Sequence, residues 1–242
     1  HFTFADSSAI GDYISVNNND FTPTGLTSDD IVVDSPTNNF CTLSPIGRRY
    51  GQSYVGSFTE GGLEVASGGN ATHTFGSMAI NNIVSEGGIY FEIRLNSIDT
   101  SRTYFGLVGD SAYTNQNSNA NGASYSFPIK AMLTQNLYFD ISGSETSNRI
   151  DLTSGNTAFS NGDVAGFAIL SDGKLFVHRN GTYLKNASGN TGNPSTGANP
   201  ITTIDLTKDH WVPYVGYNST FNVNFGQDSS FGGRETRGAN QD

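Results

Sequence analysis

Short stretches in which apolar and polar residues alternate, each bounded by turn-forming residues, are the feature that most constrains this chain. The clearest stretch is Gly88–Ile98, where every second residue is apolar, as in a half-buried antiparallel strand. Its apolar set is Ile89, Phe91, Ile93 and Leu95, and its polar set is Tyr90, Glu92, Arg94 and Asn96. Many such strands joined by polar turns predict an all-β sandwich or barrel.

Further strands are expected along the chain. The segment Gly162–Leu170 is nearly all apolar, which predicts a central strand covered on both faces, and the turn Ser171–Gly173 leads it into Gly173–Leu184. The other expected strands are Thr103–Asp110, His210–Tyr217 and Phe221–Gly226. Trp211 is expected to pack at a strand start. The predicted buried residues are Phe91, Ile93, Leu95, Phe105, Phe176, Val223 and Phe225.

Charge and cysteine content exclude several classes of protein. The net charge is −10, and the 12 Lys and Arg residues are scattered, so we expect no binding to nucleic acid or to anionic membranes. No apolar run approaches the ~20 residues that span a bilayer, so we expect no membrane insertion. Because Cys41 is the only cysteine, neither an intrachain disulfide nor a cysteine-rich zinc site can form.

The distribution of turn residues divides the chain into three parts. Residues 1–43 are predicted to form an extended arm or linker from a preceding module, residues 44–231 a β-sandwich, and residues 232–242 a polar tail. The chain starts with His1, and the alternation at His1–Phe4 suggests a piece of a longer polypeptide. Apolar residues in Ala5–Leu43 predict that this arm packs against the sandwich or against a neighbouring subunit.

Three segments of the chain stand out by their motifs: "GGIYFEIRLNSIDTSRTYFGLVG" at 87–109, "NGDVAGFAILSDGKLFVHRNGTYL" at 161–184 and "HWVPYVGYNSTFNVNFGQ" at 210–227. Together these segments resemble SPRY domains. They are similar to the family's first core strands, central hairpin and closing strands. The resemblance implies an antiparallel β-sandwich of the SPRY or concanavalin type, and it gives no ligand by itself.

The leader "NNDFTPTGLTSDDIVVDSPTNNFCTLSP" at 18–45 resembles a stretch of marine tailed-phage virion proteins, where it joins a laminin-G-like module to a SPRY-like one. This resemblance implies a structural or fibre protein located in the virion. Its expected partners are other virion subunits, with a homo-oligomer as the assembly, and a glycan or protein receptor on the host surface. One alternative is a decoration or fibre subunit that binds virion proteins alone. Another is a polysaccharide-degrading enzyme that uses Glu92 or Asp110.

No motif for catalysis or cofactor binding stands out, so we expect no enzyme and no cofactor. The four histidines lack metal-site spacing, and His178 is expected to point outward and to be hydrogen-bonded. Oxygen ligands at Asp29–Asp30 or Asp110 leave a calcium site as a weaker alternative. Glu92 is expected to face solvent or to pair with Arg94 or Lys174. Cys41 is expected to be a small buried apolar residue.

Two long loops, Asp110–Ser124 and Asn186–Asn199, are predicted to carry recognition. Sugar sites combine an aromatic face with polar hydrogen-bonding groups, and both loops offer such groups. The alternative is that these loops only pack or vary in length without binding anything. The candidate ligand-binding residues are Asp110, Tyr113, Asn115, Asn117, Asn119, Tyr183 and Asn186. No metal ligand is predicted.

Overall fold

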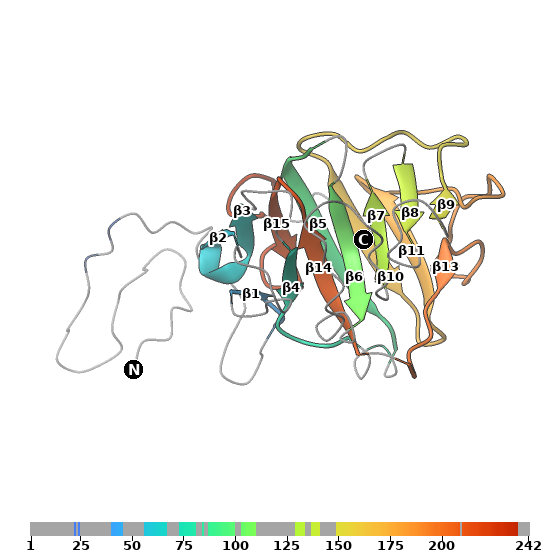
Figure 1. Ribbon diagram of the computed structural model, residues 1–242, viewed down its shortest axis with the longest axis horizontal. Coiled ribbons are helices and arrows are strands. Elements are labelled where there is room, and N and C mark those ends of the chain that lie inside the picture. Colours follow the sequence, from blue (N-terminus) through green and yellow to red (C-terminus); the bar gives the residue numbers. More distant parts are fainter. Residues whose placement is uncertain are drawn as a thin grey trace, which may run out of the picture.

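The computed structural model is a β-sandwich of two antiparallel sheets (Figure 1). It describes residues 22, 24, 40–45, 56–66, 73–80, 84, 87–99, 103–109, 129–133, 137–140, 149–208 and 210–236. The predicted all-β sandwich is therefore confirmed. Within the described residues, no helix is long and apolar enough to cross a bilayer.

The first layer, here called the β6 sheet, has seven strands among the described residues. In spatial order they are β1 (Leu43–Ser44), β4 (His73–Gly76), β14 (Trp211–Gly216), β6 (Tyr104–Gly109), β7 (Ile129–Leu133), β8 (Tyr138–Asp140) and β9 (Arg149–Asp151). Each neighbouring pair is antiparallel. Strand β14, close to the end of the chain, thus lies between β4 and β6.

The second layer, here called the β5 sheet, has eight strands in the described part of the chain. Its order is β12 (Thr182–Tyr183), β11 (Lys174–Arg179), β10 (Val164–Ile169), β5 (Ile89–Ser97), β15 (Thr220–Asn224), β3 (Glu64–Ala66) and β2 (Ser57–Thr59). Strand β13 (Thr202–Thr203) pairs with the other edge of β11, and a 3₁₀ turn, η2 (Glu60–Gly62), joins β2 to β3. The strands expected at 88–98, 162–170 and 173–184 are all present.

The main core lies between the two sheets. Alternation places Phe91, Ile93 and Leu95 on the inner face of β5, and all three are buried in one cluster with Phe105 and Val223. Phe225 is half-buried against the same cluster, and Trp211 is buried at the start of β14. The predictions of burial for Phe91, Ile93, Leu95, Phe105 and Val223 are confirmed, whereas Phe225, which was also predicted to be buried, is only partly buried.

Phe176 is also buried, as predicted, but on the opposite face of the β5 sheet. Its cross-strand partner is Ala168, which in turn pairs with Tyr90, while the flanking Leu175 and Val177 belong to the inner core. Gly192 packs directly over the ring, since a Cβ on this glycine would lie 3.1 Å from Phe176 Cδ1. The segment that follows β12 therefore covers part of the outer face of the sheet.

The segment before β1 contacts the segment after β15. Gln227 Nε2 donates to the carbonyl of Cys41 at 2.8 Å, and Phe40 contacts the chain at Gly226. In the segment beyond β15, Arg234 pairs with Glu64 of β3 at 3.0 Å, and Glu235 pairs with Arg94 of β5 at 2.8 Å. Residues 40–41 and 225–236 are thus tied to the sheets by side-chain contacts.

Candidate functional site

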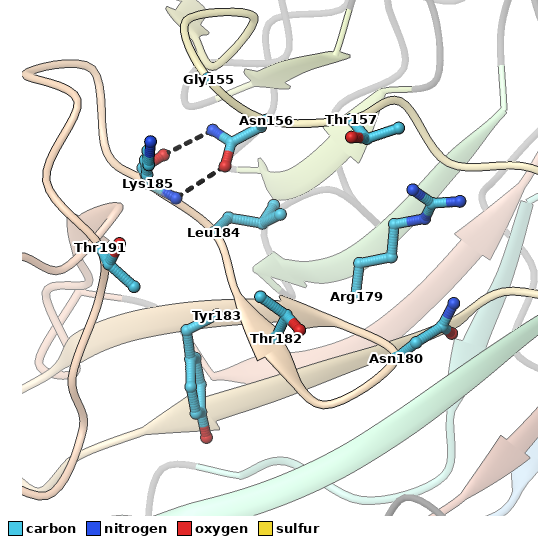
Figure 2. Close-up of a pocket in the computed structure, with 10 residues that line it drawn as sticks. All are labelled: Gly155, Asn156, Thr157, Arg179, Asn180, Thr182, Tyr183, Leu184, Lys185 and Thr191. Atoms are coloured by element: carbon cyan, nitrogen blue, oxygen red, sulfur yellow. Dashed lines mark hydrogen bonds between the residues drawn. The ribbon is translucent and has the colours of Figure 1, made fainter.

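A polar pocket of about 420 Å³ opens at the end of the β11–β12 hairpin (Figure 2). Three segments form it: the stretch 155–157 between β9 and β10, the hairpin residues 179–185, and Thr191. The described residues that line it are Gly155, Asn156, Thr157, Arg179, Asn180, Thr182, Tyr183, Leu184, Lys185 and Thr191. This volume lies within the usual range for small-molecule sites, about 300–1,000 Å³.

The hairpin beside the pocket owes its shape to an Asn-Gly turn. Asn180 and Gly181 both have left-handed backbones, with φ of 49° and 79°, as a two-residue type I′ turn requires. Asn180 also ties the turn to β10, because its Oδ1 accepts from the N–H of Val164 at 2.8 Å. The turn therefore holds Arg179 and Thr182 directly opposite each other at the pocket wall.

Asp163 anchors the same wall. Its carboxylate accepts from Arg179 Nε at 2.6 Å, from Asn180 Nδ2 at 2.7 Å and from the N–H of Ser160 at 2.6 Å. Burial alone would raise the pKa of Asp163, but these donors and the charge of Arg179 outweigh burial and lower it. Asp163 is thus held as an anion, and Arg179 is fixed through its Nε.

Asn156 fixes the opposite wall by clamping the backbone of Lys185. The N–H of Lys185 donates to Asn156 Oδ1 at 2.8 Å, and Asn156 Nδ2 donates to the carbonyl of Lys185 at 2.9 Å (Figure 2). Lys185 also pairs with Thr191 in an isolated β-bridge. Segments about 30 residues apart in sequence are therefore locked together at the pocket.

A row of cross-strand neighbours leads from the pocket across the outer face of the β5 sheet. In order it contains Tyr183, His178, Gly166, Glu92 and Asn224, one residue from each of five adjacent strands. Tyr183 packs edge-on against the His178 ring, with centroids 5.4 Å apart. In Figure 2 the Tyr183 side chain points away from Asn156 and Arg179, so it lies between the pocket rim and this row.

Hydrogen bonds along this row converge on the Glu92 carboxylate from both sides. The N–H of Gly181 donates to His178 Nδ1 at 3.1 Å, so the ring proton of His178 lies on Nε2. Nε2 then donates to Tyr90 Oη at 2.6 Å, and Tyr90 donates to Glu92 Oε1 at 2.7 Å. Asn224 Nδ2 donates to the other oxygen, Glu92 Oε2, at 2.9 Å.

The expectation for Glu92 is therefore wrong. Its exposed fraction is 1%, and it pairs with neither Arg94 nor Lys174. Arg94 pairs with Glu235 and Lys174 with Asp172. The alternation placed Glu92 on the correct side of the sheet, but that side is covered. A carboxylate so deeply buried does not reach a polysaccharide, which removes the support for Glu92 as a catalytic group.

Burial raises the pKa of Glu92, and the hydrogen bonds from Tyr90 and Asn224 lower it by less. The folded state therefore binds this proton more tightly than the unfolded state, where the pKa is about 4.3. The resulting stabilisation is complete below the unfolded-state pKa and is lost as pH rises through the folded-state value.

Comparison with Glu92→Gln isolates this effect, because glutamine does not titrate. We expect the wild type to lose stability relative to Glu92→Gln as pH rises above about 4.3, the pKa in the unfolded state. Urea unfolding of both proteins across this range measures the difference, in which the titration of other carboxyl groups cancels. A difference that is independent of pH, or one that grows in favour of the wild type, would contradict the assignment.

Among the predicted ligand-binding residues, Tyr183 lines the pocket and Asn186 lies next to it in sequence. Asn186 Oδ1 accepts from the N–H groups of Ser188 and Asn190, at 3.1 and 3.2 Å, so this oxygen closes the turn of its own loop. The remaining candidates, Asp110, Tyr113, Asn115, Asn117 and Asn119, lie outside the described residues, as does the alternative calcium site.

The sequence interpretation missed Arg179, Lys185 and the segment 155–157. The Asn-Gly dipeptide at 180–181 was the available signal, because a tight turn there brings the flanking residues to one end of the sheet. His178 is hydrogen-bonded on the outer face, as expected, and it is also buried. Cys41 is half-buried, and burial raises the pKa of its thiol, which disfavours the reactive thiolate.

In the part of the chain that the structure describes, no three His, Cys, Asp or Glu side chains are grouped as a metal site would require. The candidate site is therefore the pocket at the β11–β12 hairpin, whose side chains offer hydroxyl, ammonium and guanidinium groups. Such groups bind polar ligands through hydrogen bonds and charge.

No protein-family model matches the sequence, and no curated protein matches it either. Among solved structures, similarity extends to "Cellulose induced protein, Cip1", with a TM-score of 0.35 and 14% identity over 77% of this chain and 85% of that chain. It also extends to a mutant of HCR/D, with a TM-score of 0.32 and 9% identity over 79% of this chain and 44% of that chain. At scores this low, the assignment of the β-sandwich depends on the two sheets themselves.

Proposed function

We propose that this chain is a non-catalytic, glycan-binding module of a phage virion appendage, of the SPRY-like kind that its sequence resembles. The observation that carries the binding role is the pocket at the β11–β12 hairpin. It is preformed, because Asn156 and Asp163 hold its two walls by hydrogen bonds within the protein. A preformed site loses little conformational entropy when a ligand binds.

The chemistry of the lining suits a sugar. Thr157, Thr182 and Thr191 carry hydroxyl groups that both donate and accept, and sugar hydroxyl groups need both. Tyr183, whose ring packs against His178, adds an aromatic residue to the rim of the pocket. Adhesion of a virion to its host would then arise from many copies, since weak sites in an oligomer gain strength through multivalency.

The test is to fill the pocket. Thr191→Trp places a large side chain at the lining, and we expect it to weaken glycan binding at least about tenfold, that is, by about 1.4 kcal/mol. Ser188→Trp is the matched control, because Ser188 is exposed in the same loop and does not line the pocket. Binding is measured on an array of host-surface glycans and then by calorimetry with the best ligand.

The two variants also separate the alternatives. Equal glycan binding by Thr191→Trp and Ser188→Trp would show that the binding site does not lie at this pocket. If the wild type binds no glycan but does bind purified virions, the module is a fibre or decoration subunit that contacts other virion proteins. Release of reducing ends from a bound polysaccharide would make it an enzyme.

A further inference from the structure

The pocket differs in charge from the chain that contains it. The whole sequence has 22 acidic and 12 basic residues. Of the described residues that line the pocket, Arg179 and Lys185 are basic and none is acidic. Figure 2 shows these two side chains on either side of the segment Asn156–Thr157. Asp163 compensates the charge of Arg179 from behind the wall, so the net positive charge of the lining comes from Lys185, which favours an anionic ligand at this place.

Lys185 is held where a ligand can reach it. Gly155 has a left-handed backbone, with φ of 77°, and a Cβ there would lie 2.9 Å from Lys185 Nζ and 3.2 Å from Lys185 Cδ. The absence of a side chain at Gly155 lets the lysine lie across the turn. Its backbone is clamped by Asn156, so the start of the side chain is fixed as well.

Lys185 forms no ion pair with a described carboxylate. Five other basic residues do form one: Arg94, Lys174, Arg179, Lys208 and Arg234. Arg179 uses its Nε for Asp163, and no described residue accepts from its Nη groups. The site thus offers one ammonium group and the outer part of one guanidinium group, and both bind carboxylate or sulfate oxygens well.

Building on the proposed function, we infer that the pocket selects sugars that carry an anionic group, a carboxylate or a sulfate ester, and that Lys185 is the selecting residue. The threonine hydroxyl groups bind the hydroxyl groups of the sugar, and Lys185 binds the anion. Because the ion pair between Lys185 and the anionic group is open to water, its contribution to affinity depends on salt and is modest, about threefold to tenfold.

The test uses matched polymers with the intact chain. Polygalacturonate is compared with its carboxyl-reduced form, and dextran sulfate with dextran, by calorimetry at low and at high salt. We expect binding to at least one anionic polymer, and binding weaker by about threefold to tenfold to its neutral match. Which anionic polymer binds distinguishes a carboxylate from a sulfate.

Two variants assign the effect to Lys185. Lys185→Gln should weaken binding to the anionic polymer about threefold to tenfold, and Lys185→Arg should retain it. Lys208→Gln is the control, because Lys208 is an exposed cation that does not line the pocket. Equal losses in Lys185→Gln and Lys208→Gln would overturn the inference, since binding would then depend on overall charge.

The outcomes for the two proposals are distinguishable. Equal affinity of the wild type for the anionic and the neutral polymer of each pair would overturn the selection of anions and leave glycan binding intact. Absence of binding to all four polymers, together with no binding on the glycan array, would overturn both. Circular dichroism of each variant confirms that a loss of binding is not a loss of fold.

Discussion

Replacing Phe91 with alanine should lower the free energy of unfolding by about 3–5 kcal/mol. The Phe91 side chain is 1% exposed and lies at the centre of the β5 sheet. Its ring stacks on Phe167 of the neighbouring strand, with centroids 5.1 Å apart and planes 8° apart, and it also contacts Phe225. Alanine would leave a cavity that the surrounding strands cannot fill without losing their own packing.

Urea unfolding of the wild type and Phe91→Ala measures this loss. Phe58→Ala is the matched control, because Phe58 lies in the edge strand β2 and is only partly buried. The same chemical change there should cost clearly less. A loss below about 1 kcal/mol at Phe91, or equal losses at both positions, would show that Phe91 is not in a close-packed core.

The second large effect is expected at Gly166. A Cβ at this position would lie 2.0 Å from His178 Nε2 and 2.5 Å from two ring carbons, so even alanine must displace the imidazole. Displacement breaks the bonds of His178 to Tyr90 and Gly181. Strain of about 1–3 kcal/mol and a similar loss from broken buried hydrogen bonds predict that Gly166→Ala costs about 3 kcal/mol.

A double-mutant cycle with His178→Ala tests the cause. If the clash with the imidazole produces the loss, Gly166→Ala should cost almost nothing in the His178→Ala background, and the two changes should be strongly non-additive. Additive losses would mean that the cost at Gly166 comes from the backbone of β10. Urea unfolding of the wild type, the two single variants and the double variant provides the comparison.

The sequence pattern predicted the strands at 88–98, 103–110, 162–170, 173–184, 210–217 and 221–226, and alternation predicted the inner face of the first of them. It placed Phe91, Ile93 and Leu95 together, and the apolar run at 162–170 correctly predicted a strand that is buried on both faces. It could not predict what covers an outer face. Glu92 and Phe176 point away from the core, yet both are buried. Gly192 packs on the Phe176 ring, and Tyr90 and Asn224 donate hydrogen bonds to the Glu92 carboxylate.

The pocket was harder to predict for the same reason. Tyr183 could be identified because it is an aromatic residue beside the long polar loop Asn186–Asn199. Lys185 could not, because its position depends on Asn156, which lies 29 residues earlier in the chain. Periodicity describes one strand at a time, whereas a pocket forms where distant segments meet, and contacts of that kind leave no periodic signal in either segment.

The order of the strands has a consequence for synthesis of the chain on the ribosome. Strand β14 lies between β4 and β6, and β15 lies between β3 and β5, so each sheet is divided in two until these last strands exist. At about 5–20 residues per second, translation needs on the order of 5–20 s to pass from the end of β6 to the start of β14. Throughout that interval β5 and β6 present open edges and apolar faces to solvent, which are the features that chaperones bind and that promote aggregation.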